Sequence, residues 1–140
     1  MERAAFSLVN YKFDKVYLNF ENKISSEIEV DFTPSGLFTS NSSSVELNLL
    51  FSAFNHGRKQ NPYIEIRCVA LFQFDKPLTL EEIPVFFYSN SIAIIFPYIR
   101  SFISTVTLQA NIIPPILLPT WNLTALGDMF KGNMIQQMQK

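Results

Sequence analysis

Apolar and polar residues alternate through most of the first half of the chain, as they do in half-buried β-strands. The alternation is strictest over residues 26–33, where the apolar residues at 28, 30 and 32 are separated by acids. This period of two predicts a strand with one buried face and one acidic, water-facing face. Comparable patterns predict strands over residues 6–20, 45–54 and 63–74. In the first of these the apolar phase slips at Asp14-Lys15, which predicts a β-bulge or bend.

Polar segments separate the predicted strands. Pro34-Ser35-Gly36 is expected to break the second strand, and a Ser/Asn-rich loop follows at residues 40–44. Residues 55–62 are expected to form an exposed hairpin loop. Four strands with short polar connections favour an antiparallel sheet.

The period of the pattern changes in the second half of the chain. Apolar residues recur at three- and four-residue spacing from Ile92 to Val106, which predicts an amphipathic helix over about residues 90–109. A strand is the competing prediction, because β-branched residues between 103 and 107 have mediocre helix propensity. Ser89 or Asn90 is the expected N-cap.

Three residues qualify the predicted helices. Pro97 must lie in a first turn or produce a kink, because it cannot donate an interior hydrogen bond. A second helix is predicted over about residues 124–138, and Gly127 and Gly132 weaken it. The segment Ile83 to Tyr88 is left unassigned.

Charge is distributed unevenly along the chain. The segment from Ile83 to Leu126 contains one formally charged residue, Arg100, while eleven of the twelve acids precede Ile83. A segment this apolar has to be covered by the chain's own core, a partner subunit, a membrane or a bound polypeptide. We do not expect membrane insertion, because prolines and polar residues interrupt the uncharged run and a span needs roughly twenty mainly apolar residues.

Composition restricts the class of protein. With 140 residues, 48% of them hydrophobic, and a net charge of -1, the chain fits one domain over residues 1–140. No basic patch suggests nucleic-acid binding. The N-terminal residues lack the apolar region of a signal peptide, so a cytoplasmic protein is expected.

Residues that could carry chemistry are few. His56 is the single histidine and falls in a predicted loop, whereas Cys68 is the single cysteine and falls on the apolar side of a strand. Glu81 and Glu82 are adjacent and would point apart. We therefore expect no enzyme activity, no metal site and no cofactor.

Apolar side chains exceed what one sheet and two helices are expected to cover. The chain has 14 Phe, 5 Tyr, 4 Met and 1 Trp. Core packing and exposure are both open for six of them: Phe86, Phe87, Trp121, Met129, Met134 and Met138. An apolar surface of this kind indicates oligomerisation, polypeptide binding, or both.

Two segments of the second half resemble the bacterial protein-export chaperone SecB. Residues 95–100 (IFPYIR) with 103–104 (IS) resemble the long-helix signature of that family. Residues 114–118 (PPILL), with 122–123 (NL) and 125–126 (AL), resemble its helix-connecting loop and second helix. The preceding strands follow the family's order of elements.

The resemblance implies an α+β fold, with a four-stranded antiparallel sheet followed by two helices. It also implies a cytoplasmic homotetramer, a dimer of dimers with the long helices between the dimers. Members are ATP-independent holdases that bind unfolded polypeptides and deliver preproteins to SecA. Because this chain is nearly neutral, its sequence supports polypeptide binding better than it supports delivery to SecA.

The resemblance also assigns residues to surfaces. The client-binding groove would use Phe20, Ile24, Ile116, Leu118, Trp121, Leu126, Met129 and Phe130. The oligomer interface would use Ile95, Tyr98, Ile99, Arg100, Phe102, Ile103 and Val106. An acidic docking face would use Glu27, Glu29, Asp31 and Glu46.

Two alternatives stay open. The chain could be a SecB-like chaperone dedicated to one partner, such as the antitoxin of a toxin–antitoxin system. It could instead bind a small apolar ligand, as a monomer with an enclosed cavity rather than a tetramer with open grooves.

Overall fold

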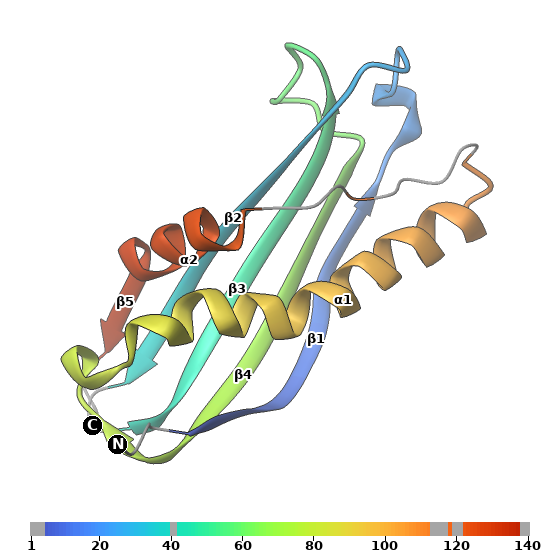
Figure 1. The fold of residues 1–140 in the computed structure, drawn as a ribbon. Coiled ribbons are helices and arrows are strands. Elements are labelled where there is room, and N and C mark those ends of the chain that lie inside the picture. The colour runs from blue at the N-terminus through green and yellow to red at the C-terminus, as the bar shows by residue number, and fades with distance from the viewer. Residues whose placement is uncertain (1–4, 40–41, 113–117, 119–121, 138–140) are drawn as a thin grey trace.

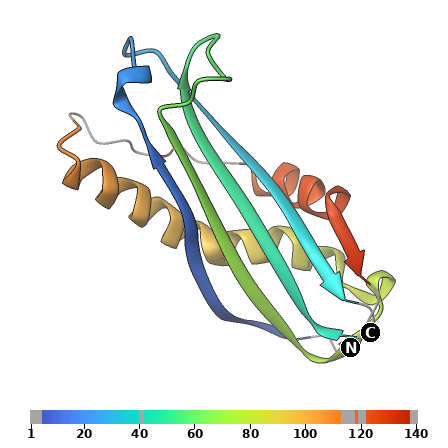
Figure 2. The same ribbon diagram turned by 180° about the vertical axis from the view of Figure 1, so that it is seen from behind.

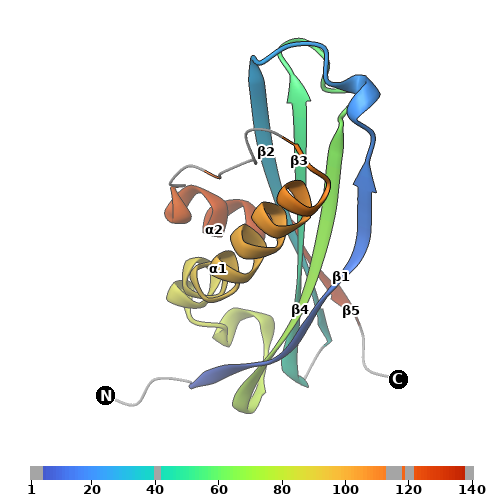
Figure 3. The same ribbon diagram turned by 90° about the vertical axis from the view of Figure 1, so that its right-hand side faces the viewer.

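A five-stranded mixed sheet carries both α-helices on one of its faces. The computed structural model describes residues 5–39, 42–112, 118 and 122–137. Figures 1 and 3 show α1 and α2 in one layer against the sheet, whose opposite face is seen in Figure 2. The predicted α+β class with two helices is therefore confirmed, whereas a purely four-stranded antiparallel sheet is wrong.

The sheet has the strand order β1-β4-β3-β2-β5. Its strands are β1 (Phe6–Leu18), β2 (Ile28–Thr39), β3 (Ser42–Asn55), β4 (Ile64–Leu78) and β5 (Met134–Gln137). The first four pair antiparallel, and β5 lies parallel to β2. Two short 3-10 helices, η1 (Phe20–Asn22) and η2 (Leu80–Glu82), follow β1 and β4.

Strand β2 does not end at Pro34-Ser35-Gly36, contrary to the prediction. The Gly36 N–H points to the β5 side of β2, since it donates to the Asn133 carbonyl. Pro34 lies two residues earlier and therefore faces the same side. Its missing N–H thus takes no bond from the β2–β3 ladder, and the strand continues.

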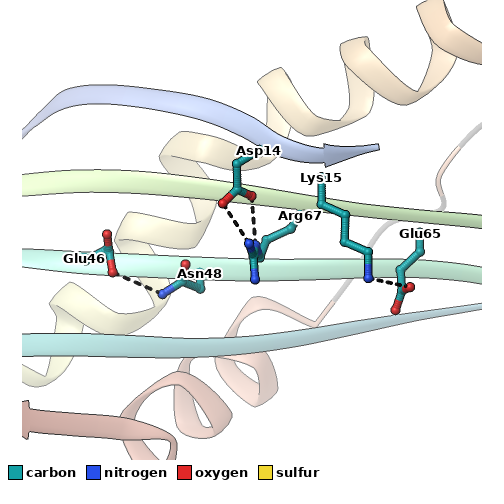
Figure 4. A network of polar contacts seen from close by, with 6 residues as sticks. All are labelled: Asp14, Lys15, Glu46, Asn48, Glu65 and Arg67. Carbon is teal, nitrogen blue, oxygen red and sulfur yellow. Dashed lines mark hydrogen bonds and ion pairs between the residues drawn. The ribbon is translucent and has the colours of Figure 1, made fainter. Parts of the chain in front are cut away.

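Strand β1 is irregular where the apolar phase slips. Its register with β4 shifts between Phe13 and Lys15, as the sequence predicts, and again between Leu8 and Asn10. The extra residue, Asp14, places its carboxylate beside Arg67 on the outer face of the sheet, with distances of 2.8 and 2.9 Å (Figure 4).

Helix α1 (Val85–Gln109) confirms the helical prediction but begins earlier than expected. Pro84, rather than Ser89 or Asn90, occupies the N-cap position, and Pro97 lies in the helix interior. Helix α2 (Leu123–Gly132) begins at the side-chain cap of Asn122 and ends six residues before the predicted boundary. The chain then continues as β5, which the sequence did not predict.

The core lies between the sheet and the helix layer. Phe87 is fully buried, and its ring centroid lies 4.8 Å from Phe6 of β1, 5.0 Å from Phe74 of β4 and 5.9 Å from Phe130 of α2. The unassigned segment before residue 89 therefore supplies a central core residue. Phe87 ties β1, β4, α1 and α2 together.

Candidate functional site

Exposed apolar side chains lie in four regions of the described chain. They are the edge strand β1, the outward side of α1, the neighbouring α2 and β5, and the β1–β2 connection, which lies at the opposite end of β2 from β5 (Figure 1). The largest exposed fractions include Val85 73%, Ile135 63%, Leu108 62%, Ile24 59%, Val9 49%, Val16 46%, Tyr98 45% and Met129 41%. The exposure of β1 was missed, although its disrupted alternation was visible in the sequence.

The predicted interface residues of α1 divide into two groups. Ile95, Ile99 and Ile103 are buried against the chain's own sheet. A partner subunit therefore cannot contact these three side chains in the folded chain. Phe102 and Val106 are half-buried, and the Phe102 ring stacks on Phe13 of β1 at 4.0 Å.

The outward side of α1 mixes apolar and uncharged polar residues and carries a single charge. Tyr98 is exposed, and its ring lies 4.6 Å from that of Tyr11 on β1. Arg100 is also exposed, and its guanidinium lies 5.0 Å from the Phe96 ring centroid, within cation–π range. No ion pair of Arg100 occurs among the described residues. With Ile94 and Leu108, these side chains form the outward surface of α1.

The β1–β2 connection holds the first two predicted groove residues. Phe20 is half-buried against the Tyr63 ring, whereas Ile24 is exposed. The buried Asn55 side chain fixes this connection, since it accepts from the Ile24 N–H at 2.7 Å and donates to the Glu27 carbonyl at 2.8 Å. The connection is therefore ordered by a satisfied buried amide.

The remaining groove residues lie mainly on α2. Leu126 and Phe130 are buried against the sheet and α1, whereas Met129 points outward. Leu118 is 8% exposed. Ile116 and Trp121 lie outside the described residues. Only part of the predicted groove set is thus open to a bound polypeptide.

A trough that the sequence did not reveal lies beside the start of α1. Two cavities, of about 440 and 410 Å³, share Val85, Tyr88 and Lys131 as lining residues. The first extends along α2 past Gly127, and the second extends to Met134 of β5. A Cβ at Gly127 would lie 2.9 Å from the Ser89 backbone nitrogen, so this glycine permits close packing of α2 on α1.

Three of the four carboxylates of the predicted acidic face have side-chain partners within the chain. Glu29 pairs with His56, and Asp31 pairs with Lys59 at 3.0 Å. Glu46 accepts a hydrogen bond from Asn48 (Figure 4). Glu27 is exposed at the start of this face. Lys59 is a cation whereas Asn48 is a neutral amide, so a partner that bound Asp31 would have to compete with an internal cation.

Residues that could act in catalysis or metal binding do not cluster in the described part of the chain. Cys68 is buried on the inner face, as predicted, and burial raises the pKa of its thiol to about 12. Tyr63 is fully buried, its hydroxyl has no hydrogen-bond partner among the residues that the structure describes, and burial raises its pKa to about 12. Among the described residues, no group of three or more His, Cys, Asp or Glu could hold a metal ion.

Helix α1 is long and apolar enough to cross a membrane by length and composition, with a mean hydropathy of 1.5. Its inward side is occupied by the sheet, and 39% of its most apolar window is buried. The outward side of α1 is exposed in the single chain.

Comparison with known proteins identifies the fold. No protein-family model matches the chain. It is 35% identical over 68 residues to the uncharacterised protein MJ0357 of Methanocaldococcus jannaschii. That match covers 49% of this chain and 43% of the relative, so it spans less than half of either protein.

Two solved structures share the architecture. One is the Mycobacterium tuberculosis SecB-like chaperone Rv1957 in complex with a ChAD peptide from the Rv1956 HigA1 antitoxin. It matches with a TM-score of 0.58 and 15% identity, over 84% of this chain and 91% of that chain. A protein of unknown function from Streptococcus agalactiae matches with a TM-score of 0.54 and 11% identity, over 85% of this chain and 100% of that chain. The chain therefore has a SecB-like fold.

Proposed function

We propose that this chain is an ATP-independent holdase chaperone that binds non-native polypeptides. The observation that carries the proposal is the fold shared with a SecB-like chaperone over 84% of the chain. The exposed apolar side chains of α1, α2 and the β1–β2 connection support it. No catalytic step belongs to the proposal.

The physical argument rests on what an unfolded segment offers. Such a segment presents apolar side chains without a fixed sequence, so its binder needs apolar area and adaptable side chains rather than a shaped catalytic site. Met129 is exposed on α2, and Met134 is half-buried beside the exposed Val85. Ile24 is exposed at the opposite end of the sheet. Methionine suits promiscuous apolar recognition.

Assembly is part of the same proposal. A long edge strand with exposed apolar residues is an aggregation hazard unless it is covered. Strand β1 is such an edge, and the outward surface of α1 (Ile94, Tyr98, Arg100 and Leu108) is a second surface with large exposed apolar side chains. We propose that copies of the chain cover both, in a cytoplasmic homotetramer built as a dimer of dimers.

A second candidate is a chaperone dedicated to one partner, such as an antitoxin. The Rv1957 complex contains an antitoxin peptide, which favours this candidate. The ion pair of Asp31 with Lys59 also favours it over delivery of preproteins to SecA, because it occupies part of the acidic face. The binder of a small apolar ligand remains a third candidate, distinguished by a monomeric mass.

The experiment combines native mass with a chaperone assay. We expect a tetramer that suppresses aggregation of a chemically unfolded, unrelated protein in the absence of ATP. A tetramer that protects only one native partner would favour the dedicated chaperone. A monomer without suppression would contradict the proposal.

A further inference from the structure

Strand β5 is an extended segment that the chain binds to its own sheet edge. It pairs in parallel with β2 over four residues, with Gly36 opposite Met134 and Leu37 opposite Ile135. The other strands of the sheet pair over longer antiparallel ladders. Figure 1 shows β5 beside β2, below the end of α2. The edge of β2 is thus able to accept a strand.

One side chain of β5, that of Met134, occupies an apolar cavity, called here the Met134 seat. Met134 is half-buried and lines the cavity of about 410 Å³ formed with Leu80, Ile83, Val85 and Tyr88. The floor of the seat is Gly36, where an added Cβ would overlap the Phe130 ring and lie 2.8 Å from Met134 Sδ. The absence of a side chain at residue 36 makes room for Met134.

The attachment of β5 is short. A ladder of four residue pairs joins it to β2. Asn133, just before β5, adds one hydrogen bond from its side chain to the Pro34 carbonyl at 2.8 Å and accepts one from the Gly36 N–H at 3.4 Å. Ile135, the next apolar residue, points away from the helix layer and is 63% exposed. A short strand with one seated side chain buries little apolar surface, so its free energy of docking is small.

We propose that β5 is an internal competitor that occupies a client-binding site at the edge of β2. An extended client segment displaces it, adds to β2 as a strand, and places one large apolar side chain in the Met134 seat. Strand addition of this kind supplies affinity through main-chain hydrogen bonds and selectivity through alternate side chains. This inference rests on the proposed holdase function and names how its clients bind.

The competition has a quantitative consequence. A client binds only the fraction of molecules in which β5 has left β2, and its apparent dissociation constant rises by the inverse of that fraction. If β5 is docked in about nine molecules of ten, release of β5 strengthens binding about tenfold. Permanent attachment of β5 would abolish binding at this site.

A reversible disulfide tests the competition. Leu37 and Ile135 are directly paired on the outer face, and neighbouring strands lie about 4.8 Å apart, within the reach of a disulfide. We would prepare L37C/I135C and measure its affinity for reduced, carboxymethylated α-lactalbumin, a permanently unfolded chain. A disulfide between β1 and β4 at the other edge of the sheet, S7C/Q73C, is the matched control. Ser7 and Gln73 are directly paired and exposed.

We expect oxidised L37C/I135C to bind the unfolded α-lactalbumin at least about tenfold more weakly than its reduced form does. Oxidation of the control S7C/Q73C should change the affinity by less than about twofold. Ile135→Pro, which removes a backbone donor from β5, should strengthen binding, and Asn133→Ala should do so more weakly. Circular dichroism would check the fold of each variant.

The contradicting results separate the two proposals. Equal affinity of the oxidised and reduced forms, or weaker binding by the folded Ile135→Pro and Asn133→Ala variants, would overturn the competition while leaving the holdase function in place. Failure of the parent chain and of every variant to bind the unfolded protein would overturn both.

Discussion

The sheet-facing and outward-facing sides of the helix layer have similar apolar residues but opposite exposure. Ile95 is fully buried, whereas the adjacent Ile94 is 39% exposed. On α2, Phe130 is fully buried and the adjacent Met129 is 41% exposed. Hydrophobicity alone therefore does not distinguish a core residue from a recognition residue; the direction of each side chain relative to the sheet does.

The largest effect is expected from Phe130. Its ring contacts Phe87 and Tyr88, so Phe130→Ala leaves a cavity between α2, α1 and Gly36. We expect a loss of about 3–5 kcal/mol in the free energy of unfolding, measured by urea denaturation. Met129→Ala is the matched control and should weaken client binding with little loss of stability. If Phe130→Ala leaves stability unchanged and only weakens binding, Phe130 belongs to the groove instead.

The adjacent isoleucines of α1 provide the next comparison. Ile95→Ala should lower the free energy of unfolding by about 2–5 kcal/mol, because the side chain is enclosed by the sheet. Ile94→Ala should cost less than about 1 kcal/mol when measured at a protein concentration too low for assembly. Similar costs at both positions would show that the two sides of α1 are not distinct.

Charges on the outward side of α1 should affect assembly rather than folding. Ile94→Lys combined with Leu108→Lys places two cations on a surface that already carries Arg100. We expect dissociation to smaller species by native mass spectrometry, with an unchanged circular dichroism spectrum. An intact assembly would place the subunit interface elsewhere, with the exposed edge of β1 as the remaining surface.

The smallest effect is expected on the outer face of the sheet, far from both sides of the helix layer. Arg67, by its hydrogen bonds, holds the pKa of Asp14 below its ordinary value. The stabilisation is therefore present above the unfolded-state pKa and is lost as the pH falls below about 4. Asp14→Asn should slightly reduce the melting temperature at pH 7 and make it less sensitive to pH in the acid range. An unchanged acid profile would contradict this role for the ion pair.

Much of the sheet could be predicted from the sequence. Strict alternation predicts which side of a strand is buried, and it correctly placed Phe32 and Cys68 inward and the bulge at Asp14-Lys15. Ile28 was also expected on the buried side, but at the start of β2 it is 42% exposed. Pro34 was misinterpreted because a proline breaks a central strand, whereas on this edge its missing N–H faces away from β3.

The helix layer was less predictable, for a physical reason. Sequence periodicity placed Ile95, and not Ile94, on the apolar side of the helix. It does not say whether the chain's own sheet or a partner subunit covers that side, and Ile95 is in fact buried against the sheet. Phe87 and Val85 fall in one short apolar segment, yet one is in the core and the other is 73% exposed. Strand β5 was missed because Met-Ile-Gln-Gln continues a plausible helix, and only pairing with β2 makes it a strand.

The most direct measurement of the central claim compares one polypeptide in two states. Fluorescence anisotropy would follow binding of native α-lactalbumin and of its reduced, carboxymethylated form to the chain, without nucleotide. The account predicts saturable binding of the unfolded form and at least about tenfold weaker binding of the native one, because only the unfolded form offers extended apolar segments. Equal affinity for both, or no binding of the unfolded form, would contradict it.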